Sequence, residues 1–127
     1  MEDACRVNRG AAVKVLVGAV VEAFVNAKLE RTDVSRALYV AASEPQGAAI
    51  VRRLSKRVHR ALTAALAKAA GATLGEMEFV ALILYSAIAG ATRSVLEAGA
   101  SEKMVVRLRE ELLVLCQAYA AKSVRSN

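Results

Sequence analysis

Residues 76–97 constrain the fold most, because at helical spacing this segment is apolar on two opposite sides. One side carries Met77, Val80, Ala81, Leu84, Ile88, Ala91 and Val95. The opposite side carries Phe79, Leu82, Ile83, Ser86, Ala89 and Gly90. A surface helix of a small protein needs only one apolar stripe. The core of a single domain covers one side, so the other side requires a partner chain, a ligand or another helix.

The composition favours one compact, all-helical domain. The chain has 127 residues, of which 56% are hydrophobic and 4% aromatic, with a single proline. These values exclude an intrinsically disordered chain. The net charge of +6 is compatible with acidic partners, including nucleic acid, although basic residues on exposed helix faces also serve solubility.

The cysteines and the N-terminus indicate a soluble, cytoplasmic protein. Cys5 and Cys116 are too few and too far apart for a disulfide framework or a metal site, so we expect no metal and no cofactor. Met1 is followed by acidic residues, unlike a signal peptide. The longest uncharged run, residues 79–92, is shorter than the roughly 20 residues of a membrane-spanning helix.

The periodicity predicts five helices and no strand. We expect them at about residues 11–29, 34–43, 46–70, 76–98 and 101–122, with a disordered segment at 1–10 and a frayed tail at 123–127. Thr73 and Glu76 have the spacing of a capping box, and Gly71 is a typical residue after a helix end. Pro45 suits the first turn of the third helix.

The last two predicted helices form a hairpin in which each helix has a spare apolar stripe. In the final helix the main face is Val105, Leu108, Leu112, Leu115 and Tyr119, and the spare stripe is Val106, Leu113 and Ala120. Two such hairpins related by a two-fold axis would bury the spare stripes in a four-helix bundle. The predicted dimer interface is therefore Phe79, Leu82, Ile83, Ser86, Gly90, Val106, Leu113 and Ala120.

Three segments carry a resemblance to a known family. They are Ala27-Lys28-Leu29-Glu30 through Arg36-Ala37-Leu38-Tyr39, the long basic and apolar helix from Pro45, and the hairpin over residues 76–122. Together they resemble the C-terminal, ligand-binding and dimerisation half of tetracycline-repressor-like (TetR family) transcription regulators, over about residues 11–122. The resemblance implies a homodimer that binds a small-molecule effector. The family's DNA-reading helix-turn-helix is missing here, so we expect DNA contact only through such a domain outside this chain. We expect the chain to be either a fragment or a natural relative without a DNA-reading domain.

The resemblance also implies a ligand cavity between the first four helices. Its candidate ligand-binding residues are Phe24, Tyr39, Val58, His59, Leu62, Tyr85 and Ser86. Further candidates are Phe79 and Ile83 for the wall and Thr92 for a polar contact. The low aromatic content favours a small, apolar ligand.

Several residues keep two interpretations. His59 is either a partly exposed helix residue or a pocket contact, since no nucleophile accompanies it and we expect no enzyme. Tyr85 and Ser86 either bond to the backbone or contact a ligand or a partner chain. The basic residues between Arg52 and Arg60 are either a solvated helix face or a nucleic-acid footprint. The alternative function is a structural helical dimer or protein-interaction module without a ligand.

Overall fold

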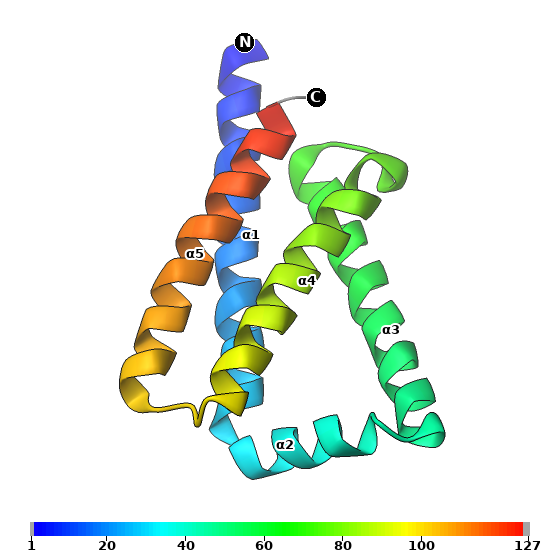
Figure 1. Ribbon diagram of the computed structural model, residues 1–127. Coiled ribbons are helices and arrows are strands. Elements are labelled where there is room, and N and C mark those ends of the chain that lie inside the picture. Colours follow the sequence, from blue (N-terminus) through cyan, green and yellow to red (C-terminus); the bar gives the residue numbers. More distant parts are fainter. Residues whose placement is uncertain (1, 126–127) are drawn as a thin grey trace.

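Five helices make up the fold. The computed structural model describes the backbone of residues 2–125 and the side chains of residues 10–124. The helices are α1 (Glu2–Glu30), α2 (Thr32–Ala41), α3 (Pro45–Ala70), α4 (Leu74–Glu97) and α5 (Glu102–Arg125) (Figure 1). No strand occurs among residues 2–125. The predicted all-α, five-helix architecture is confirmed.

The helices are arranged around α1. The final helix, α5, lies along α1, and α4 packs against α1, α3 and α5 (Figure 1). The short helix α2 joins the end of α1 to the start of α3 and lies across the open end of the α3–α4 pair (Figure 1). The helices α1, α3 and α4 therefore pack against one another, and α2 lies across one end of the group.

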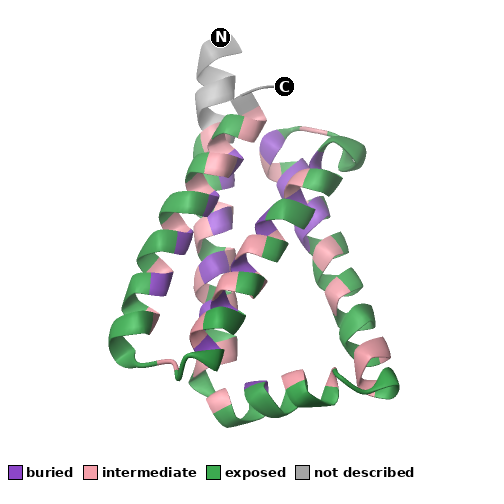
Figure 2. Ribbon diagram, in the orientation of Figure 1, coloured by how far each residue is buried: buried purple, intermediate pink, exposed green. Residues whose placement is uncertain are grey.

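The core follows the helical period on each element. In α1 the buried residues are Val13, Val17, Val21 and Val25, one every four positions. They meet Leu62 and Leu66 of α3, Met77, Leu84 and Ile88 of α4, and Leu112 and Cys116 of α5. Figure 2 shows the buried residues on the inward sides of the helices and exposed residues on the outward sides. Valine is a modest helix former, so this packing is what stabilises α1.

Local chemistry sets the predicted ends of α3 and α4. The Thr73 hydroxyl accepts a hydrogen bond from the Glu76 backbone N–H at 3.2 Å, and the Glu76 carboxylate accepts one from the Thr73 N–H at 3.4 Å. This is the reciprocal capping box that the sequence predicts. Gly71 ends α3 with φ of 65°, a left-handed conformation that glycine adopts without steric cost. Pro45 occupies the first turn of α3.

Other ends differ from the prediction. The helix α1 begins at Glu2, although a disordered segment was expected over residues 1–10. No proline interrupts this stretch, and a glycine such as Gly10 costs a helix only about 1 kcal/mol. At the other end of the chain, α5 continues to Arg125, three residues beyond the expected end.

The contact between α1 and α5 corrects part of the predicted dimer interface. Ala120 is fully buried and Leu113 is half-buried against the same core, so both face α1 and neither lies on an outer surface. At Gly18 the two helices are close enough that a Cβ atom would lie 2.9 Å from Nε2 of Gln117, so that side chain would have to shift. The Gln117 side chain also donates to the carbonyl oxygen of Lys14 at 3.0 Å. Leu115, expected on the inner face, is instead 55% exposed.

Candidate ligand-binding site

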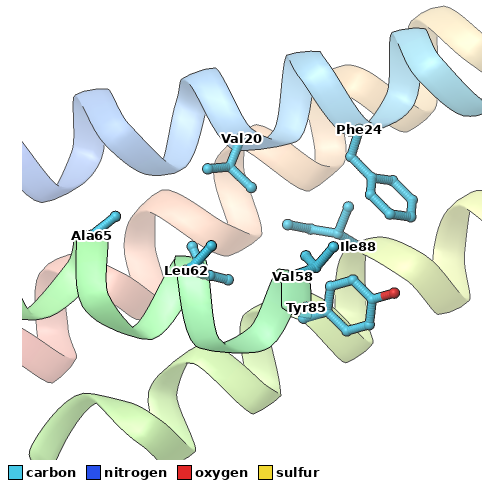
Figure 3. A pocket seen from close by; sticks show the side chains of 8 residues that line it. Val20, Phe24, Val58, Leu62, Ala65, Tyr85 and Ile88 are labelled. Atoms are coloured by element: carbon cyan, nitrogen blue, oxygen red, sulfur yellow. The ribbon is translucent and has the colours of Figure 1, made fainter. Parts of the chain in front are cut away.

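A cavity of about 280 Å³ lies between α1, α3 and α4 (Figure 3). It is lined by Val20, Phe24, Val58, Ala61, Leu62, Ala65, Tyr85 and Ile88. The Tyr85 hydroxyl is the only polar side-chain group among these residues. A concave, mostly apolar site with a single polar group is typical of a small-molecule pocket, although its volume is at the lower end of the usual range.

A second cavity, of about 160 Å³, adjoins the first at Tyr85. Its lining is more polar and comes from four helices: Lys28, Leu38, Tyr39, Ala41, Gly47, Ile50, Val51, Leu54, Ser55 and Tyr85. The Ser55 hydroxyl lies 3.3 Å from the Tyr85 hydroxyl, within hydrogen-bond distance. Since Tyr85 lines both cavities, its hydroxyl marks their boundary.

Three aromatic rings and two cations surround this boundary. The rings of Phe24 and Tyr85 pack edge to face, with centroids 6.0 Å apart. The Lys28 ammonium lies 5.7 Å from the Phe24 ring and 5.8 Å from the Tyr39 ring. On Tyr39, the Arg93 guanidinium lies 4.8 Å from the ring. Burial raises the pKa of the Tyr39 hydroxyl, and the Arg93 charge opposes that shift.

Five of the seven predicted ligand-binding residues line these cavities. Phe24, Val58, Leu62 and Tyr85 line the first cavity, and Tyr39 lines the second. These five residues were predicted from the family resemblance, which implies a cavity between the first four helices.

The other predicted site residues lie elsewhere. Nε2 of His59 is 2.9 Å from the carbonyl oxygen of Glu78, so its ring links α3 to the first turns of α4. Ser86 is exposed on the side of α4 that faces away from the cavities. The proposed wall residues Phe79 and Ile83 are exposed on that same outer side. Thr92 is fully buried but lines neither cavity.

Sequence reasoning missed some lining residues. The most important are Val20, Ile88, Lys28 and Ser55. Val20 lies one turn before Phe24, and Ile88 lies three residues after Tyr85, so helical spacing from the predicted residues could have found both. No local signal marks Lys28 or Ser55, because polar residues on a helix ordinarily indicate solvent.

An exposed apolar surface lies on the opposite side of α4. We call it the outer face, and it consists of Phe79, Leu82, Ile83, Ser86 and Gly90 of α4 with Met104, Val114 and Leu115 of α5. Phe79 is 67% exposed and Val114 is 68% exposed. A Cβ atom added at Gly90 would meet nothing within 4 Å. Val106, also predicted at a dimer interface, is exposed nearer the start of α5.

The comparisons with known proteins identify the family. The model of the family described as "Tetracyclin repressor-like, C-terminal domain" matches residues 14–119. The chain belongs to this family. Domains of this family generally bind effectors and dimerise in regulators, which are not enzymes. Neither the curated proteins nor the solved structures include a match to this tetracycline-repressor-like domain.

Two helices of this tetracycline-repressor-like domain are apolar enough to span a membrane by length and composition alone. They are Gly10–Glu30 and Leu74–Glu97. Both are longer than the longest uncharged run, residues 79–92, because a membrane-spanning helix tolerates a few charged residues. Both helices supply core residues, and the core helix of a soluble protein passes the same test. Regulators of this family are generally soluble and cytoplasmic.

Proposed function

We propose that this chain is the effector-binding and homodimerisation domain of a cytoplasmic TetR-like transcription regulator. The observation that carries the proposal is the pair of adjoining cavities, lined from all of the first four helices, in a domain of this family. The ligand is small and mostly apolar, in keeping with the walls of the larger cavity. DNA contact belongs to a helix-turn-helix domain, and none of the five helices described here serves that role.

The outer face supports the dimer part of the proposal. Its apolar residues lie on two antiparallel helices of one hairpin, so a second copy related by a two-fold axis places four helices together. Many exposed apolar residues on one hairpin favour an interaction site. An ordinary interface buries about 800 Å² on each partner, which two helices of 24 residues each can supply.

The position of α4 supports a mechanism of regulation. This helix lines the larger cavity with Tyr85 and Ile88 and carries much of the outer face on its other side. A ligand that binds one arrangement of α4 more tightly than another shifts the population toward that arrangement. The shift changes the angle between the two subunits and hence the spacing of any attached DNA readers.

Binding of a neutral apolar probe tests the effector-binding part. The probe is 1-octanol, titrated calorimetrically into the wild type, into Ala65→Phe and into Ala64→Phe. Ala65 lines the larger cavity, whereas its neighbour Ala64 is exposed on α3. We expect saturable binding to the wild type and to Ala64→Phe, and at least about tenfold weaker binding to Ala65→Phe, which fills the cavity.

The same samples discriminate the alternative function. A structural dimer or protein-interaction module without a ligand predicts dimers in sedimentation but no saturable octanol binding by any of the three proteins. That alternative depends only on the outer face, whose residues do not line either cavity. If Ala65→Phe leaves octanol binding unchanged, octanol does not bind in the larger cavity and the proposed effector site is wrong.

A further inference from the structure

Lys28 is a cation of the site that forms no ion pair with the side chains of residues 10–124. It lines the second cavity and is only partly exposed, with its ammonium near the Phe24 and Tyr39 rings. Arg31, Arg93, Arg107 and Arg109 form ion pairs with nearby carboxylates, and none of these pairs involves Lys28. Contacts with two ring faces stabilise an ammonium, but each contributes less than a carboxylate partner in a desolvated site.

Two arginines lie at the C-terminal end of α4, where Tyr39 packs. Arg93 makes the other cation contact with the Tyr39 ring. It also forms an ion pair with Glu97 at 2.9 Å, so these two charges cancel each other. Arg36 donates to the carbonyl oxygen of Leu96 at 3.3 Å, close to the same end of α4. Whereas Arg93 is paired, Lys28 and Arg36 form no ion pair with the side chains of residues 10–124. Apolar walls lower the local dielectric and strengthen their attraction for an anion.

The neutral polar groups extend the same arrangement toward the larger cavity. The Ser55 and Tyr85 hydroxyls both line the second cavity, and either can donate a hydrogen bond to an anionic oxygen. Beyond Tyr85 the lining is wholly apolar. The site thus changes along its length from an ammonium, through two hydroxyls, to aliphatic and aromatic walls.

We infer that the ligand is a monoanionic amphiphile, with an anionic head group at Lys28 and an aliphatic body in the cavity between α1, α3 and α4. This inference rests on the proposed function and specifies the ligand class for that site. At about 30 Å³ for each group of water or methylene size, 280 Å³ accommodates about nine such groups. A medium-chain carboxylate fits this description.

A cationic ligand is the natural competitor, because aromatic rings at such a site can enclose a quaternary ammonium. Here the Lys28 ammonium and the Arg93 guanidinium already occupy ring faces of Phe24 and Tyr39. A second cation would displace them and meet their repulsion. The charge at the junction therefore favours an anion over a cation.

The experiment compares three probes that share one chain and differ in head-group charge: octanoate, 1-octanol and octyltrimethylammonium. Each is titrated calorimetrically into the full chain at low ionic strength. We expect octanoate to bind at least about tenfold more tightly than 1-octanol, because a charge-assisted hydrogen bond contributes that much affinity. Octyltrimethylammonium should have the lowest affinity of the three. Hexanoate and decanoate, each with its alcohol, establish whether the preference persists across chain length.

Three variants assign the preference to Lys28. Lys28→Met keeps an unbranched apolar stem and is expected to weaken octanoate about tenfold while leaving 1-octanol within about twofold. Lys28→Arg keeps the charge and is expected to retain the preference. Lys14→Met removes an exposed lysine of the same helix and serves as the matched control.

The outcomes separate this inference from the proposed function. Equal affinity for octanoate and 1-octanol, or tighter binding of octyltrimethylammonium, overturns the anionic ligand while the cavity remains an effector site. A carboxylate preference that Lys28→Met leaves intact also overturns it. If none of the probes binds at any chain length, the effector-binding function itself fails.

Discussion

The hydroxyl oxygen of Tyr85 lies 3.3 Å from the hydroxyl oxygen of Ser55, and this pair is the polar link between α4 and α3 at the boundary of two cavities. Tyr85→Phe removes the link but keeps the ring that packs on Phe24. We expect the free energy of unfolding to fall by about 1 kcal/mol, the usual net contribution of a hydrogen bond. Urea denaturation measures it. Ser55→Ala should give a similar loss, and the double variant should lose less than the sum if the two hydroxyls are partners.

Leu66 is fully buried in the core, and its truncation tests how tightly the helices pack. We expect Leu66→Ala to lower the free energy of unfolding by about 2–5 kcal/mol, through lost burial and the cavity that remains. Leu74→Ala is the control, because Leu74 is mostly exposed at the start of α4 and should change stability by less than about 1 kcal/mol. Equal effects in urea denaturation would mean that the core is not where the structure places it.

Thr92 is fully buried, and among the side chains of residues 10–124 its hydroxyl oxygen is one of two buried polar atoms without a hydrogen-bond partner. Thr92→Val replaces the hydroxyl with a methyl group of similar size. We expect the free energy of unfolding to rise by about 1–2 kcal/mol, since an unpaired buried hydroxyl is costly. Thr63→Val is the matched comparison, because the Thr63 hydroxyl donates to the carbonyl oxygen of His59 at 2.7 Å. That variant should not gain stability in the same thermal or urea measurement.

Phe79 projects from the outer face, and a charge at this position tests the dimer. Phe79→Glu is expected to convert a dimer into a monomer in sedimentation at micromolar concentration, because dimerisation would bury an unpaired carboxylate. Helicity should stay unchanged, since the side chain is 67% exposed in the single chain. Val15→Glu alters an equally exposed valine of α1 and should leave the dimer intact. A wild type that sediments as a monomer would contradict the prediction at the outset.

Burial raises the pKa of the Cys116 thiol from 9.0 to about 11. The folded state favours the neutral thiol, so its contribution to stability is complete below pH 9 and is lost as the pH rises through about 11. We expect the difference in unfolding free energy between the wild type and Cys116→Ala to decrease over this range. Urea denaturation at successive pH values measures it, and tyrosine ionisation cancels because it is common to both proteins. A difference that is independent of pH would contradict the prediction.

Local sequence signals predicted the ends of α3 and α4 well. The capping box of Thr73 and Glu76 and the left-handed Gly71 act within one helical turn, so no tertiary information is needed to recognise them. The start of α1 was not predictable in this way. Its first residues lack a periodic apolar stripe, and such a stripe is the signal by which a helix is recognised.

The placement of individual faces depended on contacts between helices. The seven-residue spacing of Leu113 and Ala120 correctly indicated lengthwise packing against a helix, but that helix is α1 of the same chain. For α4, periodicity separated the inner from the outer side and placed Ser86 on the outer one, whereas the family resemblance made Ser86 a candidate ligand contact. Only the packing of α3 against Tyr85 decides which of these two neighbouring hydroxyls lies inside. Lys28 and Ser55 came from no pattern, because their roles depend on the position of α2.

Tyr85 and Ser86 are consecutive residues, yet one borders the interior cavities and the other lies on the outer face. In the proposed dimer, a single α-helix about 10 Å across therefore separates the ligand cavity from the neighbouring subunit. Main-chain hydrogen bonds link successive turns of such a helix, so a ligand that shifts α4 from the cavity side would move its outer face as well. In the proposed regulator, communication between ligand and dimer interface would then require no chain of intermediate residues, and its sensitivity would depend on how firmly the two ends of α4 are anchored.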